Sequence, residues 1–231
     1  FFFKQKTAYE ISTRDWSSDV CSSDLLYQGA LAVYGAEEMQ RSYGQLVGVP
    51  AERVQSSSDG QRIRLGGREL ELIDTPGHAR HHHCIWDPRS QGWFTGDTFG
   101  LSYREFDVAG RAWVMPTSTP VQFEPQALRQ SVQRLLERQP QCVYLTHYGK
   151  LGDVAALGQA LLDLLERTVA LALPLRDAPQ RHTALCEALR RLYVDDLRAF
   201  GCTLTEAQIA DALAIDIELN AQGLAIWLDK P

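Results

Sequence analysis

Apolar and charged residues alternate between Gln61 and Asp74, which is the pattern of strands with one buried face. The alternation is interrupted once, at Gly66-Gly67. Two glycines in a row readily adopt the positive φ angles of a tight hairpin turn. The sequence therefore predicts a β-hairpin over residues 61–74.

Three further short segments are predicted to be strands, at His81–Trp86, Trp93–Gly96 and Cys142–Thr146. A polar turn rich in Asp, Pro, Ser and Gly separates the first two. Residues 99–122 combine aromatic and small polar side chains without a regular period, which is typical of an insertion that walls a binding site. We therefore expect sheet strands both before and after a long irregular segment.

Helical periodicity dominates the rest of the chain. After Asp153, leucines and valines recur at intervals of three and four residues and form one apolar stripe. Thr205 and Gln208 have the spacing of a capping box, which marks a helix start. Helices are predicted at Leu26–Tyr43, at Pro125–Glu137, from Asp153, at Gln180–Phe200, from Thr205 and at Asn220–Leu228.

The first 25 residues differ from the rest of the chain. They hold two of its four lysines and five clustered serines, and they do not begin with Met. The segment resembles the peptide obtained when sequencing-adapter DNA is translated in frame with a gene. We therefore predict that residues 1–25 are an artefactual or disordered leader and leave them out of the fold. The alternative is a natural disordered leader.

Charge and cysteine content narrow the functional classes. The net charge of the chain is −6, and residues 177–231 carry five basic and nine acidic side chains, so we expect no binding to nucleic acids or membranes. The five cysteines form no CxxC pair, which favours reduced thiols in a cytoplasmic protein. The sequence contains no run of about 18 apolar residues, so no transmembrane helix is predicted. The expected partners are a small-molecule substrate and a second copy docked through the C-terminal helices.

Candidate chemistry lies in three short motifs, each placed where a strand is predicted to end. They are Thr75-Pro76-Gly77-His78, Gly96-Asp97-Thr98 and Thr146-His147. Pro76 fixes φ and Gly77 permits a sharp turn, so the His78 ring is presented with little freedom. Histidine and aspartate are ligands of borderline metals. The alternatives are ordinary turns, with Asp97 closing an Asx-turn. The order of the three motifs favours convergence on one metal centre.

This order of motifs resembles the second half of the metallo-β-lactamase-fold hydrolases, which include glyoxalase II and lactonases. The resemblance implies an α/β fold, here a partial αββα metallo-β-lactamase sandwich (its second half) with a helical C-terminal extension. His78 would be a ligand of a first metal site, Asp97 the carboxylate that bridges two metals and His147 a ligand of the second. One or two divalent metal ions are implied, with zinc expected and iron or manganese as alternatives.

The chain departs from the family in one respect. The family's His-x-His-x-Asp-His motif, which supplies four further ligands, does not occur in the sequence. We therefore expect residues 26–175 to form a truncated metallo-β-lactamase-like domain and residues 176–231 a helical extension. The parent protein is expected to be a hydrolase, in which a metal-activated water attacks an ester, thioester, amide or phosphate bond, and the chain alone is expected to be inactive. The alternatives are an iron-dependent redox member such as a sulfur dioxygenase, or a non-enzymatic binding module.

Supporting roles are predicted for three neighbours of these ligands. His82, Thr98 and Tyr148 are expected to hold or surround the ligands rather than to bind metal, because ligands usually need such outer partners. If residues 81–86 form a strand, His81 and His83 share one face and His82 lies on the other. His182, far along the chain, is expected at the surface.

Overall fold

The computed structural model of the chain describes residues 11–13, 31, 35–37, 39–41, 55–118 and 122–230. The chain divides into two compact units, residues 1–61 and 62–231.

Within the first unit, β1 (Ile11–Thr13) pairs in parallel with β2 (Gln55–Ser57). β1 belongs to the predicted leader, of which the remainder lies outside the described residues. Most of the helix predicted at Leu26–Tyr43 also lies outside them, and those residues of it that are described are helical.

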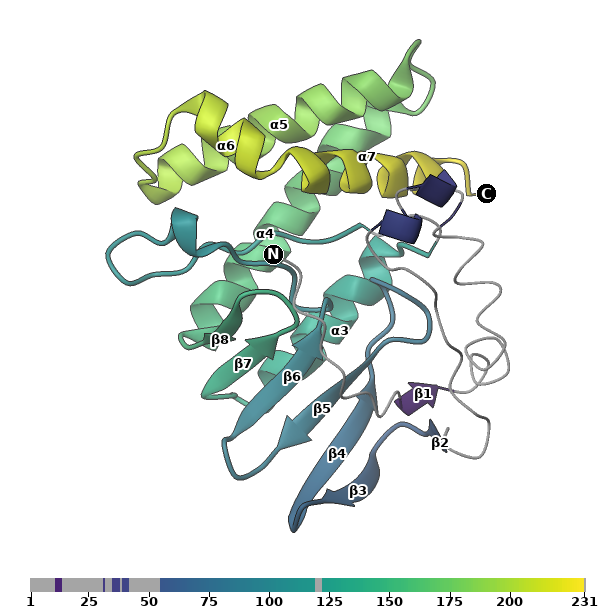
Figure 1. The fold of residues 1–231 in the computed structure, drawn as a ribbon, viewed down its shortest axis with the longest axis vertical. Coiled ribbons are helices and arrows are strands. Elements are labelled where there is room, and N and C mark those ends of the chain that lie inside the picture. Colours follow the sequence, from purple (N-terminus) through teal and green to yellow (C-terminus); the bar gives the residue numbers. More distant parts are fainter. Residues whose placement is uncertain are drawn as a thin grey trace. The chain divides into compact units, whose positions relative to one another are not determined.

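One six-stranded sheet underlies the second unit, and its strand order follows the chain (Figure 1). The β4–β5, β5–β6 and β7–β8 pairs are antiparallel, whereas β6 and β7 are parallel. A parallel pair needs a long crossover, and here the crossover contains helix α3. The strands span Gln61–Leu65 (β3), Arg68–Asp74 (β4), His83–Asp87 (β5), Gly92–Gly96 (β6), Cys142–Leu145 (β7) and Gly149–Leu151 (β8).

The sheet directions place the three motifs together. Because β4 and β6 both run antiparallel to β5, they run in the same direction, and β7 is parallel to β6. The C-terminal ends of these three strands therefore lie at one edge of the sheet. His78, Asp97 and His147 all follow those ends within four residues. The topology thus explains the convergence that the motifs predicted.

The predicted α/β fold is confirmed, and several elements are found where they were expected. The hairpin turns at Gly66 and Gly67, with φ of 54° and 80°. The strand predicted at 81–86 is wrong at its start, because His81 and His82 lie in the loop before β5 and the alternation argument does not apply to them. The loop closes through a bond from the Thr75 N–H to the His82 carbonyl, at 2.9 Å. Strand β8 was not predicted.

The helices agree closely with the periodicity. Pro125 begins α3, and Thr205 and Gln208 form both bonds of the predicted capping box. The last helix begins at Ala214 rather than Asn220, because Leu213, Ile217 and Ala221 continue its buried stripe. The helices span Arg104–Phe106 (η2), Pro125–Glu137 (α3), Val154–Ala172 (α4), Leu173–Leu175 (η3), Arg181–Phe200 (α5), Glu206–Ala212 (α6) and Ala214–Leu228 (α7).

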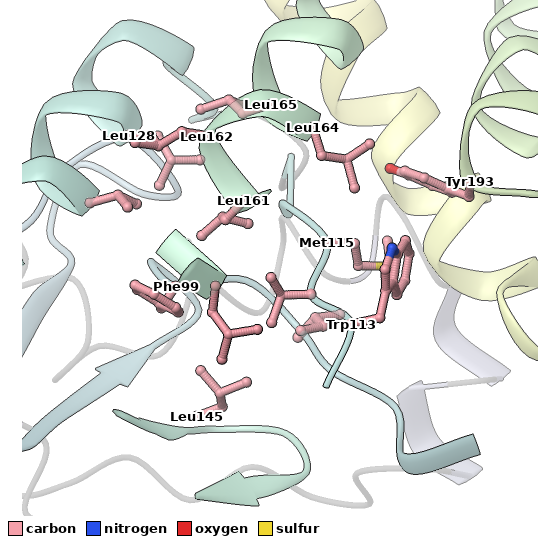
Figure 2. Packing of buried hydrophobic residues seen from close by; sticks show 14 of the residues in the cluster. Phe99, Trp113, Met115, Leu128, Leu145, Leu161, Leu162, Leu164, Leu165 and Tyr193 are labelled. Atoms are coloured by element: carbon pink, nitrogen blue, oxygen red, sulfur yellow. The ribbon is translucent and has the colours of Figure 1, made fainter. Parts of the chain in front are cut away.

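A single hydrophobic core runs from the sheet through α3 and α4 to α5 and α7 (Figure 2). Trp93 of the sheet is fully buried, and its indole N–H donates to the Leu135 carbonyl of α3 at 3.0 Å. Tyr193 of α5 is also fully buried and packs edge-on against Trp113. The C-terminal helices therefore share a core with the sheet, and the domain boundary expected at residue 175 stays a prediction.

The other face of the sheet carries an apolar row. Ile85, Phe94 and Tyr144 lie side by side on neighbouring strands. The Phe94 and Tyr144 rings stack at 4.6 Å, and Phe94 is 40% exposed. Among the described residues, none of the helices is both long and apolar enough to cross a membrane.

Candidate metal centre

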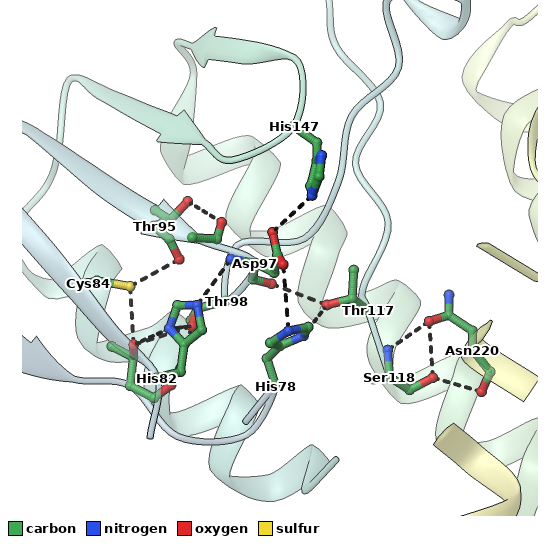
Figure 3. Close-up of polar contacts among 12 residues, drawn as sticks. His78, His82, Cys84, Thr95, Asp97, Thr98, Thr117, Ser118, His147 and Asn220 are labelled. Atoms are coloured by element: carbon green, nitrogen blue, oxygen red, sulfur yellow. Dashed lines mark hydrogen bonds and ion pairs between the residues drawn. The ribbon is translucent and has the colours of Figure 1, made fainter. Parts of the chain in front are cut away.

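Asp97 lies between the two histidines of the predicted site (Figure 3). Its Oδ2 is 3.6 Å from Nε2 of His78, and its Oδ1 is 3.8 Å from Nε2 of His147. Both separations exceed the length of a hydrogen bond. One carboxylate oxygen thus faces each imidazole, which is the arrangement of a carboxylate that bridges two cations.

A docked turn fixes the position of His78. Gly77 has a φ of 128°, and a Cβ there would lie 2.1 Å from the backbone nitrogen of Leu128 in α3. The Gly77 carbonyl accepts a bond from the Glu124 N–H at 2.8 Å, and the Ser131 hydroxyl donates to the Pro76 carbonyl at 2.7 Å. Only glycine permits this close approach, so the motif sits directly on the first turns of α3.

The hydrogen bonds of His78 determine which ring nitrogen can bind a metal. The Thr117 hydroxyl donates to the Asp97 carbonyl at 3.3 Å, so it accepts from Nδ1 of His78 at 2.7 Å. We infer that Nδ1 carries the proton and that Nε2, which faces Asp97, offers a lone pair. Burial lowers the pKa of His78, which keeps the ring neutral. A neutral ring with its Nδ1 held by an outer partner is the usual form of a metal-binding histidine.

His82 orients Asp97 through the backbone. Its Nε2 accepts the Asp97 N–H at 3.2 Å, while its Nδ1 lies 2.9 Å from the Thr98 hydroxyl. Burial lowers the pKa of His82 to about 3, so the ring stays neutral and remains an acceptor. Gly96 makes room for it, since a Cβ there would lie 2.4 Å from Nε2 of His82. His82 and Thr98 thus contact Asp97 and each other, and their supporting roles stay a prediction.

Thr75, Cys84 and Thr95 form a hydrogen-bonded group next to His82. The Cys84 thiol is fully buried and donates to the Thr95 carbonyl at 3.4 Å. Burial raises the pKa of Cys84 to about 12, so the thiol stays protonated. The Thr75 hydroxyl contacts both the Cys84 thiol and the His82 ring, at 3.2 Å from Cys84 Sγ and 3.2 Å from His82 Nδ1.

A sequence model of one family matches residues 25–194, which is most of the chain, and it is the model of the metallo-beta-lactamase superfamily. The chain belongs to this superfamily. The metallo-beta-lactamase fold-containing protein ST1585 of Sulfurisphaera tokodaii is 29% identical over 133 residues, covering 58% of this chain and 42% of that protein. The chain therefore matches less than half the length of this curated relative.

Solved structures show the same fold. The crystal structure of the archaeal superfamily protein ST1585 from Sulfolobus tokodaii matches with a TM-score of 0.58 and 22% identity, covering 93% of this chain and 69% of that one. The family protein TTHA1429 from Thermus thermophilus also matches with a TM-score of 0.58, at 14% identity, covering 94% of this chain and 65% of that one.

The superfamily binds metals, and the residues around Asp97 fit one. Asp97 Oδ1 is buried and receives no hydrogen bond from the part of the chain that the structure describes. An unsatisfied buried carboxylate oxygen is costly, and a cation between it and His147 would remove that cost. Two imidazole nitrogens and a carboxylate form the donor set of a zinc, iron or manganese site. The side chain of His147 is 47% exposed and that of Asp97 27%, so ions and small molecules can reach them.

Tyr148 lies beside the centre rather than in it. Its ring packs on Tyr103 at 4.5 Å, and its carbonyl accepts a bond from Arg104 of η2. The Tyr103 hydroxyl donates to Oδ2 of Asp216 in α7 at 2.5 Å. Burial raises the pKa of Asp216, which interacts electrostatically with His147. A chain of contacts thus links the His147 turn to the last helix.

Sequence reasoning missed two residues that position the His78 and Asp97 side chains. Thr117 was not singled out because it lies in a segment without a period. Asn220 accepts the Ser118 N–H at 2.8 Å (Figure 3). Its side-chain amide also donates to the Pro116 carbonyl at 3.3 Å. These contacts join residues about 100 positions apart in the chain, so no local pattern signals them. Asn220 thereby anchors the segment that carries Thr117.

The depressed pKa of His82 predicts acid sensitivity of the metal-free chain. In the unfolded chain this histidine titrates near 6.5, whereas in the fold it titrates at about 3. Between these two pH values the unfolded state binds one more proton than the folded state. The titration of His82 therefore lowers the free energy of unfolding by about 1.4 kcal/mol for each pH unit below 6. Urea unfolding with a chelator present, from neutral pH to about pH 4, measures this slope. In the His82→Gln variant the free energy of unfolding should depend less steeply on pH, by the equivalent of about one proton. Equal slopes in the two proteins would contradict a buried, neutral His82.

Proposed function

We propose that the chain carries part of the active site of a metal-dependent hydrolase, in which His78, Asp97 and His147 hold one or two divalent cations, zinc being the expected metal. The observation that supports this most is the position of the Asp97 carboxylate, with one oxygen facing each histidine at 3.6 and 3.8 Å. Such a carboxylate can bind two cations and offset their repulsion. The expected substrates are small molecules with an ester, thioester, amide or phosphate bond.

The bound metal would supply a water of lowered pKa and stabilise negative charge in the transition state. The protein's own residues fix the donors in advance. Thr117 holds the His78 ring through Nδ1, and His82 holds the backbone of Asp97. Preorganised donors lose little freedom when a cation or substrate arrives. Because a metal-bound water would act as the nucleophile, the reaction would require none from the protein.

Three ligands hold a cation less firmly than the larger set typical of the family. The His-x-His-x-Asp-His motif does not occur in the sequence. We therefore propose that the chain alone binds metal weakly and is nearly inactive.

Turnover measurements test the proposal. The zinc-loaded chain is compared with a protein in which a family segment bearing the His-x-His-x-Asp-His motif is joined ahead of residue 26. Hydrolysis of a chromogenic ester and of a lactone is followed in both. We expect at least about a 100-fold higher rate in the joined protein, because the completed donor set positions the cation. Equal rates in the two proteins would refute it, whereas oxygen uptake with a thiol substrate by the iron-loaded protein would favour the redox alternative.

A further inference from the structure

A second group of potential metal ligands lies on the C-terminal helices and shares no residue with the His78 centre. His182 and Cys186 are four residues apart on α5, so they lie on one face of that helix. Glu218 approaches them from α7. The two helices contact each other, and Leu185, Leu189, Ile217, Ala221 and Leu224 are buried in the same hydrophobic core. The backbone that carries the three side chains is therefore firmly placed.

The three donor atoms form a compact triangle. Oε2 of Glu218 is 3.1 Å from Nε2 of His182 and 3.7 Å from Sγ of Cys186, and the Nε2 and Sγ atoms are 3.6 Å apart. All three atoms are thus about 2.0 Å from the centre of the circle through them. Zinc binds nitrogen and oxygen at about 2.0–2.2 Å and sulfur at about 2.3 Å. An ion slightly above the plane of the triangle would satisfy all three distances and keep a fourth position for water.

Neighbouring groups prepare the donors. The Gln222 side chain donates to Oε1 of Glu218 at 2.7 Å, and both carboxylate oxygens lie 3.1 Å from Nε2 of His182. The Gln222 bond is the main reason that the pKa of Glu218 is lowered, so the carboxylate is ionised at neutral pH. Burial, followed by the Glu218 charge, raises the pKa of Cys186 to about 11. The thiol proton therefore points to Glu218 in the metal-free chain.

We propose that His182, Cys186 and Glu218 bind one zinc-class divalent cation that links α5 to α7. On binding, the Cys186 S–H bond breaks, its proton passes to solvent and the thiolate sulfur coordinates the cation. Cysteine, histidine and glutamate together favour zinc over calcium or magnesium, which prefer oxygen ligands alone. The side chains of His182 and Glu218 are 45% and 49% exposed, so the cation can enter from solution. This site is independent of the proposed hydrolase.

Cobalt titration of the whole chain tests the site, because only a thiolate ligand produces a near-ultraviolet charge-transfer band with cobalt. The His78 centre contains no cysteine ligand, so the band separates the two sites. We expect saturable appearance of the band, its competition by zinc and its loss in Cys186→Ser. The apparent affinity for cobalt, measured from this band, should fall about tenfold in His182→Ala and in Glu218→Gln. Circular dichroism verifies that each variant is folded.

Two matched variants complete the experiment. Cys202→Ser removes a different partly buried thiol and should leave the band unchanged. Asp97→Asn should also retain it, so failure of the hydrolase proposal does not affect this result. Absence of the band from the unaltered chain would overturn the proposal. Undiminished affinity in both His182→Ala and Glu218→Gln would also overturn it, because the thiolate would then bind without the other two side chains.

Discussion

Replacing Asp97 by asparagine is expected to lower the affinity for zinc at the His78 centre by about 100-fold or more. Loss of an outer partner of a metal ligand already costs about ten- to 100-fold, and Asp97 supplies the only carboxylate between His78 and His147 in the described site. The amide removes the negative charge and leaves one oxygen. Asparagine keeps the backbone bond to His82, so the turn itself should be preserved.

Isothermal titration with zinc measures this effect. It is best done in a Cys186→Ser background, so that binding at the α5–α7 site does not contribute. Asp163→Asn is the matched control, because Asp163 lies exposed on α4 and contacts only Gln159 among the contacts described. The control should bind as the background does. Equal affinity of the Asp97→Asn and Asp163→Asn variants would mean that Asp97 is not a ligand.

Gly77→Ala is expected to destabilise the fold by about 3–5 kcal/mol. A Cβ at residue 77 would lie 2.1 Å from the nitrogen and 2.3 Å from the Cα of Leu128. These are backbone atoms of α3, and that helix cannot easily retreat because Leu128, Val132 and Leu135 are buried in the core. The φ of 128° adds backbone strain for any residue with a side chain.

Gly110→Ala separates the two contributions. Gly110 also has a positive φ, 76°, but a Cβ there would meet nothing within 4 Å. This variant should therefore lose only the backbone term, about 1–2 kcal/mol. Urea unfolding of both variants in the presence of a chelator gives the comparison. Equal losses of stability would show that residue 77 does not rest on α3 as described.

The sequence indicated that His78, Asp97 and His147 lie together because each position depends on a local signal. Pro76 and Gly77 fix a turn after a strand, and Asp97 and His147 follow buried strands directly. Parallel directions of β4, β6 and β7 then place these ends at one edge, a relation that the order of motifs suggested but could not establish. Helices α3 and α6 were predicted equally well because a proline at N1 and a capping box are local too.

The parts that the sequence did not predict depend on contacts between distant segments. The alternation argument failed at His81 and His82 because the backbone bond from Thr75 to His82 closes a loop there. His82 as an acceptor of the Asp97 N–H could not be foreseen from spacing. Asn220, on the last helix, holds the segment that carries Thr117, so the C-terminal helices support the site although their sequence contains no motif for it.

Anomalous diffraction at the zinc edge tests the central claim most directly. Crystals of the chain, grown in the Cys186→Ser background and soaked in millimolar zinc, would locate every bound ion. The account predicts an anomalous peak in contact with the Asp97 carboxylate and with Nε2 of His78, of His147 or of both. A map in which zinc occupies other surfaces but leaves this carboxylate without a peak would contradict the account.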